Sequence, residues 1–259
     1  MAKFFYKIIP FVAIFSAVFY LFRTSDYYTA KILSASLGGA ATLYGTIGSM
    51  YGLIAAFVIN RQWEQWNNLE DAVKSEVDAL ERFWLWFSNF PKETRDRVQM
   101  RVKRYLELMI NEGLQLSADG IRSQAIEDAL NSLHKTVYHM FKEDQSLMSP
   151  SFGLFADILK CRSDRLRYSS HKVPRVLVGT LVFGVFLMVG LSFFVVIKNI
   201  FFDYIFTIGI GTLAYMIYLV VGDLNNPLRP GDWHITTRDY KDLLKRIEAA
   251  ETIQHMESK

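Results

Sequence analysis

Basic side chains gather in one part of this 259-residue chain, next to an apolar segment. Six of them lie within residues 160–175, directly before a long apolar stretch. Basic residues beside an apolar segment orient a membrane span and attract anionic lipid head groups, each contributing about 1 kcal/mol near the leaflet. The alternative interpretation is a vestibule that gathers anions at the mouth of a pore. The six candidate juxtamembrane residues are Lys160, Arg162, Arg165, Arg167, Lys172 and Arg175.

The other reactive residue types do not form a catalytic or metal-binding pattern. His134 and His139 are five residues apart, so they do not share a helix face as two metal ligands would, and the other three histidines are scattered. Cys161 is the single cysteine, which excludes a disulfide framework and a CxxC pair. The sequence contains no P-loop, GxSxG or HExxH motif. We therefore predict no catalytic residue, metal or cofactor, and we do not expect an enzyme.

The distribution of charge, rather than its amount, indicates where the chain resides. Hydrophobic residues make up 51% of the chain and charged residues 21%, and mean hydropathy is +0.14. Residues 32–60, 176–197 and 204–222 contain no charged side chain, and each segment is near the roughly 20 residues that a helix needs to cross a bilayer. The net charge of +3 is too small to indicate a nucleic-acid partner. The composition excludes an ordinary soluble enzyme and predicts a lipid bilayer as the chain's surroundings.

A weaker apolar segment, residues 8–22, contains Pro10 and supplies a first span. It lacks a pair of small residues at its end, so we interpret it as an uncleaved span rather than a signal peptide. The sequence thus predicts an all-α membrane protein with four transmembrane helices. We expect transmembrane helices 1 and 2 in residues 1–60, a helical domain in 61–175, a transmembrane hairpin in 176–222, and a turn with an amphipathic helix in 223–259.

Orientation follows from the basic residues that flank these spans. The two short connections on one side carry only Arg23, Lys31 and Lys198, whereas the other side carries most of the basic residues near the spans. Because cytoplasmic loops hold the excess of Lys and Arg, we expect the middle domain and both termini to be cytoplasmic.

The second span carries small residues at helical spacing, in two series four residues apart. Small residues let helix backbones approach closely in lipid, where apolar burial gives helices little reason to associate. Two interpretations remain open: packing against other helices of the same chain, or lining of a central pore formed by several subunits. The candidate residues for either role are Ala41, Gly45, Gly48, Ser49, Gly52 and Ala56.

Residues 61–175 combine 18 basic and 17 acidic residues with apolar positions spaced for helices. One apolar stripe steps by three or four residues from Trp66 to Phe87, before Pro91 ends the helix. Further helices are expected from about Glu93, Gly120 and Ser149, with a break across residues 111–120, and a last amphipathic helix from about Thr237. We predict that these helices form a bundle.

Four short patterns resemble a bacterial family of membrane proteins described as bestrophin-like. They are Phe57-Val-Ile-x-x-x-Trp63, Glu76-x-x-Ala79-Leu80, Arg162-x-x-Arg165-Leu166 and the segment from Asp223 to Pro227. The resemblance runs from about Gly38 to Gly231 in the order that the family shows. The chain departs from the family's Pro-Phe-x-Gly turn, because it has Pro227-Leu-Arg-Pro-Gly231 instead.

Bestrophins are pentameric anion channels with a helical cytoplasmic body and a pore lined by the second span. The resemblance implies a bestrophin-like homo-oligomeric ion channel, a pentamer in the inner (cytoplasmic) membrane, in contact with anionic lipid head groups. It does not carry over a calcium site, because no matching acidic run is present. The alternative hypothesis is a membrane-anchored scaffold or signalling protein whose cytoplasmic helical domain binds a protein partner.

Overall fold

The computed structural model describes residues 2–25, 39–118, 121–140, 148–170, 173–193, 195 and 199–257. Every regular element within these ranges is a helix, so the predicted all-α class is confirmed. The chain divides into two compact units. We call Met1–Glu64, Val173–Asn225 and Gly231–Trp233 the apolar unit, and Gln65–Lys172, Asn226–Pro230 and His234–Lys259 the charged unit.

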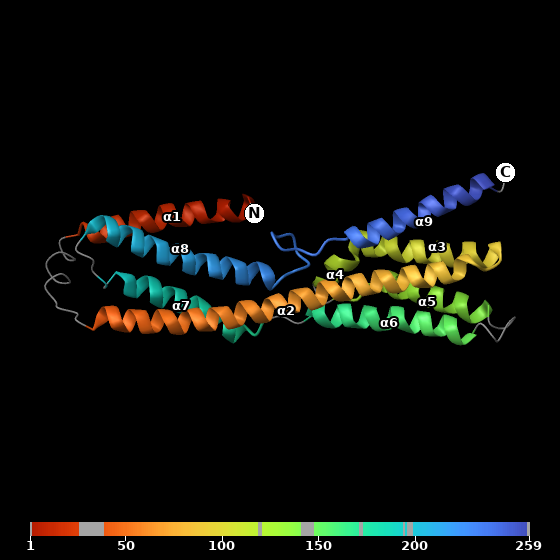
Figure 1. Ribbon diagram of the computed structural model, residues 1–259, viewed down its shortest axis with the longest axis horizontal. Helices are drawn as coiled ribbons and strands as arrows, with labels where there is room; N and C mark the ends of the chain where they lie inside the picture. The colour runs from red at the N-terminus through yellow and green to blue at the C-terminus, as the bar shows by residue number, and fades with distance from the viewer. Residues whose placement is uncertain are drawn as a thin grey trace. The chain divides into compact units, whose positions relative to one another are not determined.

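Four helical segments build the apolar unit: α1 (Ala2–Arg23), the first part of α2 (Ala40–Ser88), α7 (Arg175–Ser192) and α8 (Ile200–Leu224). Helix α8 packs against both α1 and α7 (Figure 1). The rings of Phe11 and Tyr215 stack with their centroids 4.1 Å apart, and Arg23 Nη2 lies 2.8 Å from Asp203 Oδ2. These contacts attach the predicted first span along much of its length to the rest of the unit.

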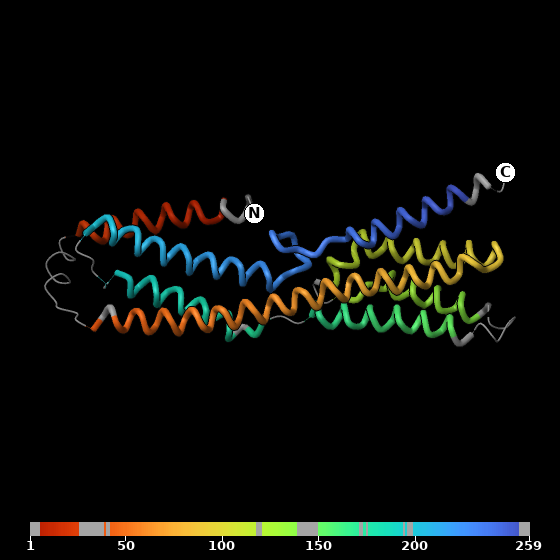
Figure 2. Tube along the Cα trace, viewed as in Figure 1, coloured from red at the N-terminus to blue at the C-terminus, as the bar shows by residue number. Residues whose placement is uncertain are grey.

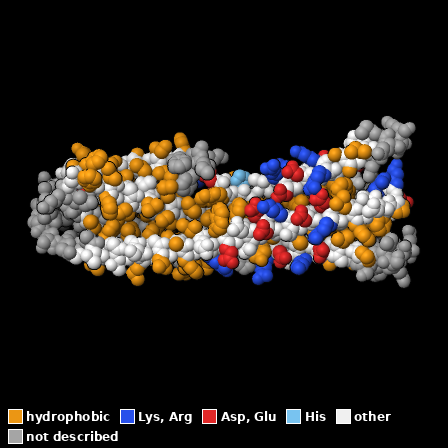
Figure 3. Space-filling model, viewed as in Figure 1, with side chains coloured by type: hydrophobic (Ala, Val, Ile, Leu, Met, Phe, Trp, Pro, Cys, Tyr) orange, Lys and Arg blue, Asp and Glu red, His pale blue; other side chains and the backbone are white. Residues whose placement is uncertain are grey.

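Three helices of the described chain are long and apolar enough to cross a membrane, within Tyr6–Arg23, Thr42–Ser88 and Ile200–Leu224. The apolar stretch of α7, Val176–Ser192, is shorter, and residues 194, 196 and 197 of the predicted third span lie outside the described residues. Figure 3 shows hydrophobic side chains covering the helices of the apolar unit, whereas Lys, Arg, Asp and Glu gather over the charged unit. A crossing by α7, and with it the total of four spans, stays a prediction.

Within the described residues, the charged unit is a bundle of α2's second part with six further helices, traced in Figure 2. Helix α3 packs against α5 and α9, and α6 packs against α4 and α5. The predicted stripe on α2 is confirmed as core, because Leu69, Val73, Val77, Leu80 and Phe87 are all buried. The six helices are α3 (Lys92–Leu108), η2 (Met109–Gly113), α4 (Leu114–Ala118), α5 (Gln124–Met140), α6 (Met148–Ser170) and α9 (Arg238–Glu257).

The break expected across residues 111–120 is wrong for its first part. Helix α3 passes into a π-helical turn, η2, and then into α4 without leaving helical geometry. Gly113 packs closely in this turn, because a Cβ there would lie 2.5 Å from Met109 Sδ and would displace that side chain. A glycine read as a helix breaker is therefore a packing glycine, while Asp119 and Gly120 lie outside the described residues.

Candidate functional site

The small residues of α2 divide between two faces of the helix. Gly45, Ser49, Gly52 and Ala56 are exposed and recur at intervals of four, three and four residues, which places them on one helix face. Among the described residues, nothing lies within 4 Å of a Cβ built on Gly45 or Gly52. We call these four residues the open face of α2. The side chain of Ala41, which the spacing adds to this face, is outside the description.

Gly48 lies beside the open face, towards the packed side of the helix. A Cβ on Gly48 would lie 3.1 Å from Met188 Cε, and Ala55 and Val58 are buried in a cluster with Leu181. The expected series Gly48, Gly52, Ala56 is therefore split, because only Gly48 packs within the chain. Intramolecular packing explains Gly48 and leaves the open face without a neighbour among the described residues.

The charged unit contains a buried polar cluster that sequence reasoning did not assemble. Glu76 of α2 and Arg165 of α6 are 0% and 1% exposed, and Arg165 Nε donates to Glu76 Oε2. Tyr105 of α3 donates its hydroxyl to Glu76 Oε1, and Tyr240 of α9 donates to Oε2 over 3.2 Å. One carboxylate thus connects four helices that are far apart in the sequence.

A second arm of this cluster reaches η2 and α4. Arg165 Nη1 donates to Ser117 Oγ at 2.7 Å, and that hydroxyl donates to the carbonyl oxygen of Gly113, also at 2.7 Å. Arg165 Nη2 lies 3.7 Å from Met109 Sδ. The guanidinium is therefore satisfied on several sides, as a buried charge requires. We call Glu76, Tyr105, Ser117, Arg165 and Tyr240 the Glu76 network.

The electrostatics of the network follow from its burial. Burial raises the pKa of the Tyr105 and Tyr240 phenols well above 10, and the Glu76 charge raises both further. Burial opposes the charged form of Arg165, but Glu76, Tyr240 and Tyr105 together outweigh that effect and leave the guanidinium pKa above its ordinary value. Both tyrosines therefore stay protonated donors and Arg165 stays cationic. The network thus connects helices and is not a proton-transfer site.

The six basic residues before the third span do not form one exposed surface. Arg165 is buried in the Glu76 network, so the expected contact with lipid head groups is wrong for this residue in this fold. Arg162 binds Glu127 of α5 through Nη2–Oε1 at 2.6 Å and Nη1–Oε2 at 3.3 Å. Lys160 and Arg167 are exposed; Lys172 and the side chain of Arg175 lie outside the described residues.

The ion pair between Glu127 and Arg162 changes the pKa of the Glu127 carboxyl. The hydrogen bond from Arg162 lowers the pKa of the Glu127 carboxyl below its ordinary value, against the opposing effect of burial. The pair joins α5 to α6. Two of the family-pattern arginines, Arg162 and Arg165, thus hold helices together.

Two residues of the Asp223-to-Pro227 pattern, Asp223 and Asn225, also have structural partners. Asp223 Oδ2 accepts hydrogen bonds from the backbone nitrogens of Asp232 at 2.9 Å and Trp233 at 3.1 Å. Asn225 Oδ1 accepts from the backbone nitrogen of Val173 at 3.0 Å. The segment after α8 is therefore ordered by its own acidic and amide side chains.

No group of three or more His, Cys, Asp and Glu side chains within the described ranges is placed to hold a metal ion. His134 packs its ring 5.3 Å from that of Phe155, and His234 lies in the segment between α8 and α9. His171 and the side chains of His139 and His255 lie outside the described residues. Burial, followed by the charge of Glu76, raises the pKa of the Cys161 thiol.

Two signals in the sequence point to the network in retrospect. Glu76 lies three residues after Val73 and four before Leu80, so a carboxylate interrupts a stripe that is otherwise apolar. A charge on a buried stripe requires a partner of opposite sign. Arg165 likewise follows Phe155 and Ile158 on the buried side of α6. The pairing itself spans 89 positions, which local spacing does not reveal.

Comparison with known proteins identifies the family of this chain. Residues 11–237 match the model of the bestrophin-like domain. No curated protein matches the chain.

Solved structures share the fold at low sequence identity. One variant of a bacterial bestrophin homologue from Klebsiella pneumoniae has a TM-score of 0.74 at 11% identity, covering 95% of this chain and 98% of that one. A second variant of it has a TM-score of 0.71 at 11% identity, covering 95% and 96%. A crystal structure described as a membrane protein has a TM-score of 0.74 at 10% identity, covering 92% and 97%.

Proposed function

Because the chain belongs to the bestrophin-like family, we propose that it forms a homo-oligomeric anion channel whose pore is lined by the open face of α2. The family match covers most of the chain, and the structures that share its fold include a bacterial bestrophin homologue. At 11% identity those structures support the fold alone, so the function rests on the family together with the features of this chain.

The open face of α2 is the observation that carries the proposal. Small exposed residues at Gly45, Ser49, Gly52 and Ala56 leave room beside a helix that is long and apolar enough to span a bilayer. Copies of the same face arranged around a symmetry axis would enclose a path, as closed rings of identical subunits do. Residues 42–60 carry no ionisable side chain of the Asp, Glu, Lys, Arg or His type, which favours passive conduction over proton coupling.

The orientation and the preference for anions belong to the same proposal. The charged unit and both termini face the cytoplasm of the inner membrane, because most basic residues near the spans lie on that side. Lys160 and Arg167 are the exposed basic residues of segment 160–170, and exposed basic side chains near a leaflet attract anionic lipid heads. Arg162 and Arg165 serve the packing of the charged unit instead.

The Glu76 network has a supporting part in this proposal. It binds α2 to α3, α6 and α9 through one carboxylate, which follows the part of α2 assigned to the pore along the sequence. An ion path through an oligomer needs its lining helices held in a fixed rotation, since a turned helix would present different side chains. The network supplies that constraint on the second part of α2.

Purified protein in nanodiscs tests the oligomer by native mass spectrometry, and the proposal expects one closed assembly, a pentamer in keeping with the family. Liposomes containing the same preparation test conduction, with chloride flux exceeding potassium flux. A monomer or dimer without flux would contradict the proposal and favour the scaffold hypothesis. A verified ring that passes no ion would retain the oligomer and remove the channel.

A further inference from the structure

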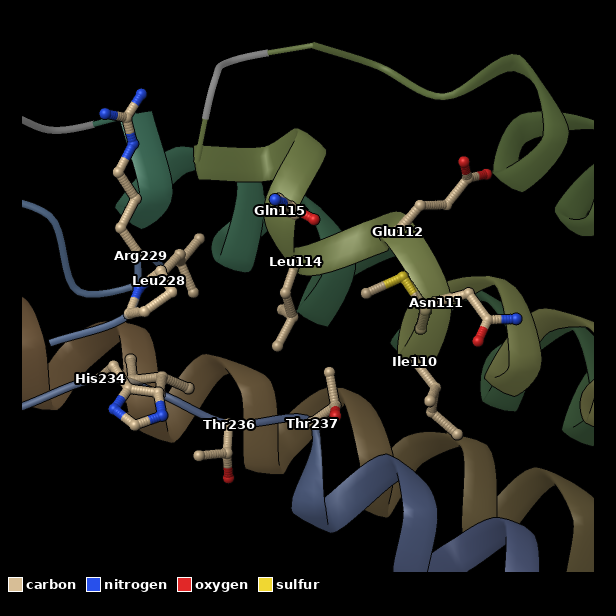
Figure 4. Close-up of a pocket in the computed structure, with 13 residues that line it drawn as sticks. Ile110, Asn111, Glu112, Leu114, Gln115, Leu228, Arg229, His234, Thr236 and Thr237 are labelled. Carbon is tan, nitrogen blue, oxygen red and sulfur yellow. The ribbon is translucent and has the colours of Figure 1, made fainter.

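The charged unit contains a cavity of about 550 Å³ that the proposed channel function does not use. One wall is η2 with the start of α4, and the other is the segment 228–237 that leads into α9 (Figure 4). Binding sites for small molecules commonly enclose about 300–1,000 Å³. The cavity therefore has the size of a metabolite site.

The lining of the cavity combines aliphatic side chains with polar ones, among them Gln115 and Thr236. Figure 4 shows the side chains of Leu114 and Leu228 on opposite sides of the opening, with the Thr237 side chain also directed at this space. Leu114 is 5% exposed, so this wall is part of the packed unit rather than a loose surface. An aliphatic or aromatic body placed here would contact both leucines and lose water-exposed area.

Charge is distributed unequally around the rim. Arg229 lies beside Leu228 on one side, and His234 comes from the same connecting segment (Figure 4). Glu112 lies on the far side, where it accepts a hydrogen bond from Ser123 Oγ at 3.2 Å. An anionic group is attracted to the Arg229 side and repelled by the Glu112 side, so a bound anion has one favoured direction.

We propose that this cavity binds a small organic monocarboxylate, with its carboxylate at Arg229 and its apolar body between Leu114 and Leu228. Arginine recognises carboxylates through paired N–H donors, which a lysine or a neutral side chain does not reproduce. The site is separate from the open face of α2, and its occupancy does not depend on conduction.

Binding at this position would stabilise the charged unit, because both walls are connected to Glu76. The first wall reaches it through Gly113, Ser117 and Arg165. The second wall leads directly into α9, whose Tyr240 donates to Glu76. A ligand that contacts both walls favours the arrangement in which they are closed on the network, and a ligand that binds only the folded state raises its unfolding temperature.

The test uses the full-length protein in nanodiscs and 4-phenylbutyrate as the probe, with empty nanodiscs as the baseline. Saturation-transfer NMR and thermal unfolding report binding. We expect saturable binding and a rise in unfolding temperature, with affinity about tenfold weaker in Arg229→Gln, the equivalent of about 1.4 kcal/mol. Arg238→Gln is the matched control, because Arg238 is an exposed arginine nearby that does not line this cavity.

Three outcomes would overturn the proposal. The first is no binding above empty nanodiscs, and the second is equal binding by the two arginine variants. The third is binding of the cation 4-phenylbutylamine as tight as that of 4-phenylbutyrate. Leu228→Trp, which fills the opening, should abolish binding; because Leu228 is half-buried and packs against the core, the unfolding temperature of this variant without probe is compared with that of the unmodified protein. None of these measurements involves ion flux, so their failure is distinguishable from failure of the channel proposal.

Discussion

Replacing Glu76 with glutamine tests whether the Glu76 network holds the charged unit together. The substitution keeps the size and one acceptor oxygen but leaves the Arg165 guanidinium, 1% exposed, without a counter-charge. Removing one partner of a buried ion pair typically costs about 3–5 kcal/mol. Because whole domains are stable by only about 5–15 kcal/mol, we expect the charged unit to lose a large share of its unfolding free energy.

Glu81→Gln is the matched control, because Glu81 lies on the same helix and pairs with Arg246 at 2.5 Å. The Arg246 side chain is 54% exposed and that of Glu81 22%, so this pair should contribute only about 0–1 kcal/mol. The two substitutions therefore make the same chemical change at a buried and at a more exposed ion pair.

The assay is urea unfolding of the full-length protein in micelles, followed by tryptophan fluorescence. Three of the five tryptophans, Trp66, Trp84 and Trp86, lie in the charged unit and report its unfolding. The double variant Glu76→Gln/Arg165→Met should be about 1–3 kcal/mol more stable than the sum of the single losses predicts. A loss for Glu76→Gln no larger than that for Glu81→Gln, or simple additivity in the double variant, would refute the reasoning.

Three further predictions concern single side chains. Glu127 has a lowered pKa in the folded state, so its stabilising contribution is present above about pH 4.5 and lost as pH falls through the lowered pKa. In urea unfolding, Glu127→Gln should therefore cost about 1 kcal/mol of stability at pH 7 and nothing at pH 3. A cost that does not change with pH would contradict this. Gly231→Ala places a Cβ against the Asp223 carboxylate, which accepts hydrogen bonds from the backbone nitrogens of residues 232 and 233, and should speed amide exchange of these two residues about tenfold. Gly222→Ala, with open space around its Cβ, should leave their exchange unchanged. Equal effects of the two substitutions would exclude the steric cause. Cys161 has a raised thiol pKa, so iodoacetamide should modify it several-fold more slowly than free cysteine at pH 8, and modification as fast as that of free cysteine would show an unshifted thiol.

Local spacing predicted the helices well because a buried stripe is a property of neighbouring positions. The stripe from Trp66 to Phe87 and the start of α6 near Ser149 follow from residues within one or two turns. The same reasoning failed at Gly113, where the helix continues through a wider π-helical turn and the glycine packs against Met109. A glycine that ends a helix and a glycine that packs inside one can be distinguished only when the packing partner is known.

The candidate site was less predictable, because its features depend on tertiary contacts. Spacing identified the small residues of α2 but could not assign Gly48 to Met188 and Gly52 to the open face. Arg165 looked like one of six equivalent basic residues until the fold paired it with Glu76. The membrane-flanking charges that sequence patterns treat alike therefore divide into packing residues and exposed residues only in three dimensions.

The most direct test of the pore compares cysteines at two adjacent alanines of α2. Ala56 lies on the open face, whereas Ala55 is 2% exposed within the packed cluster. The two residues are of the same type and are adjacent in the sequence, so they differ mainly in the direction of the side chain. Each cysteine is introduced into a Cys161→Ser background, because Cys161 is the single native cysteine. Chloride flux in liposomes is then measured before and after an anionic, membrane-impermeant methanethiosulfonate reagent.

A thiol reacts with such a reagent only as a thiolate in contact with water, so a cysteine facing lipid stays unmodified. If the open face lines the pore, the reagent should label Ala56→Cys and block most of its chloride flux, while Ala55→Cys remains unlabelled and keeps its flux. An Ala56→Cys channel that conducts chloride but is neither labelled nor blocked would contradict the assignment of this face to the pore.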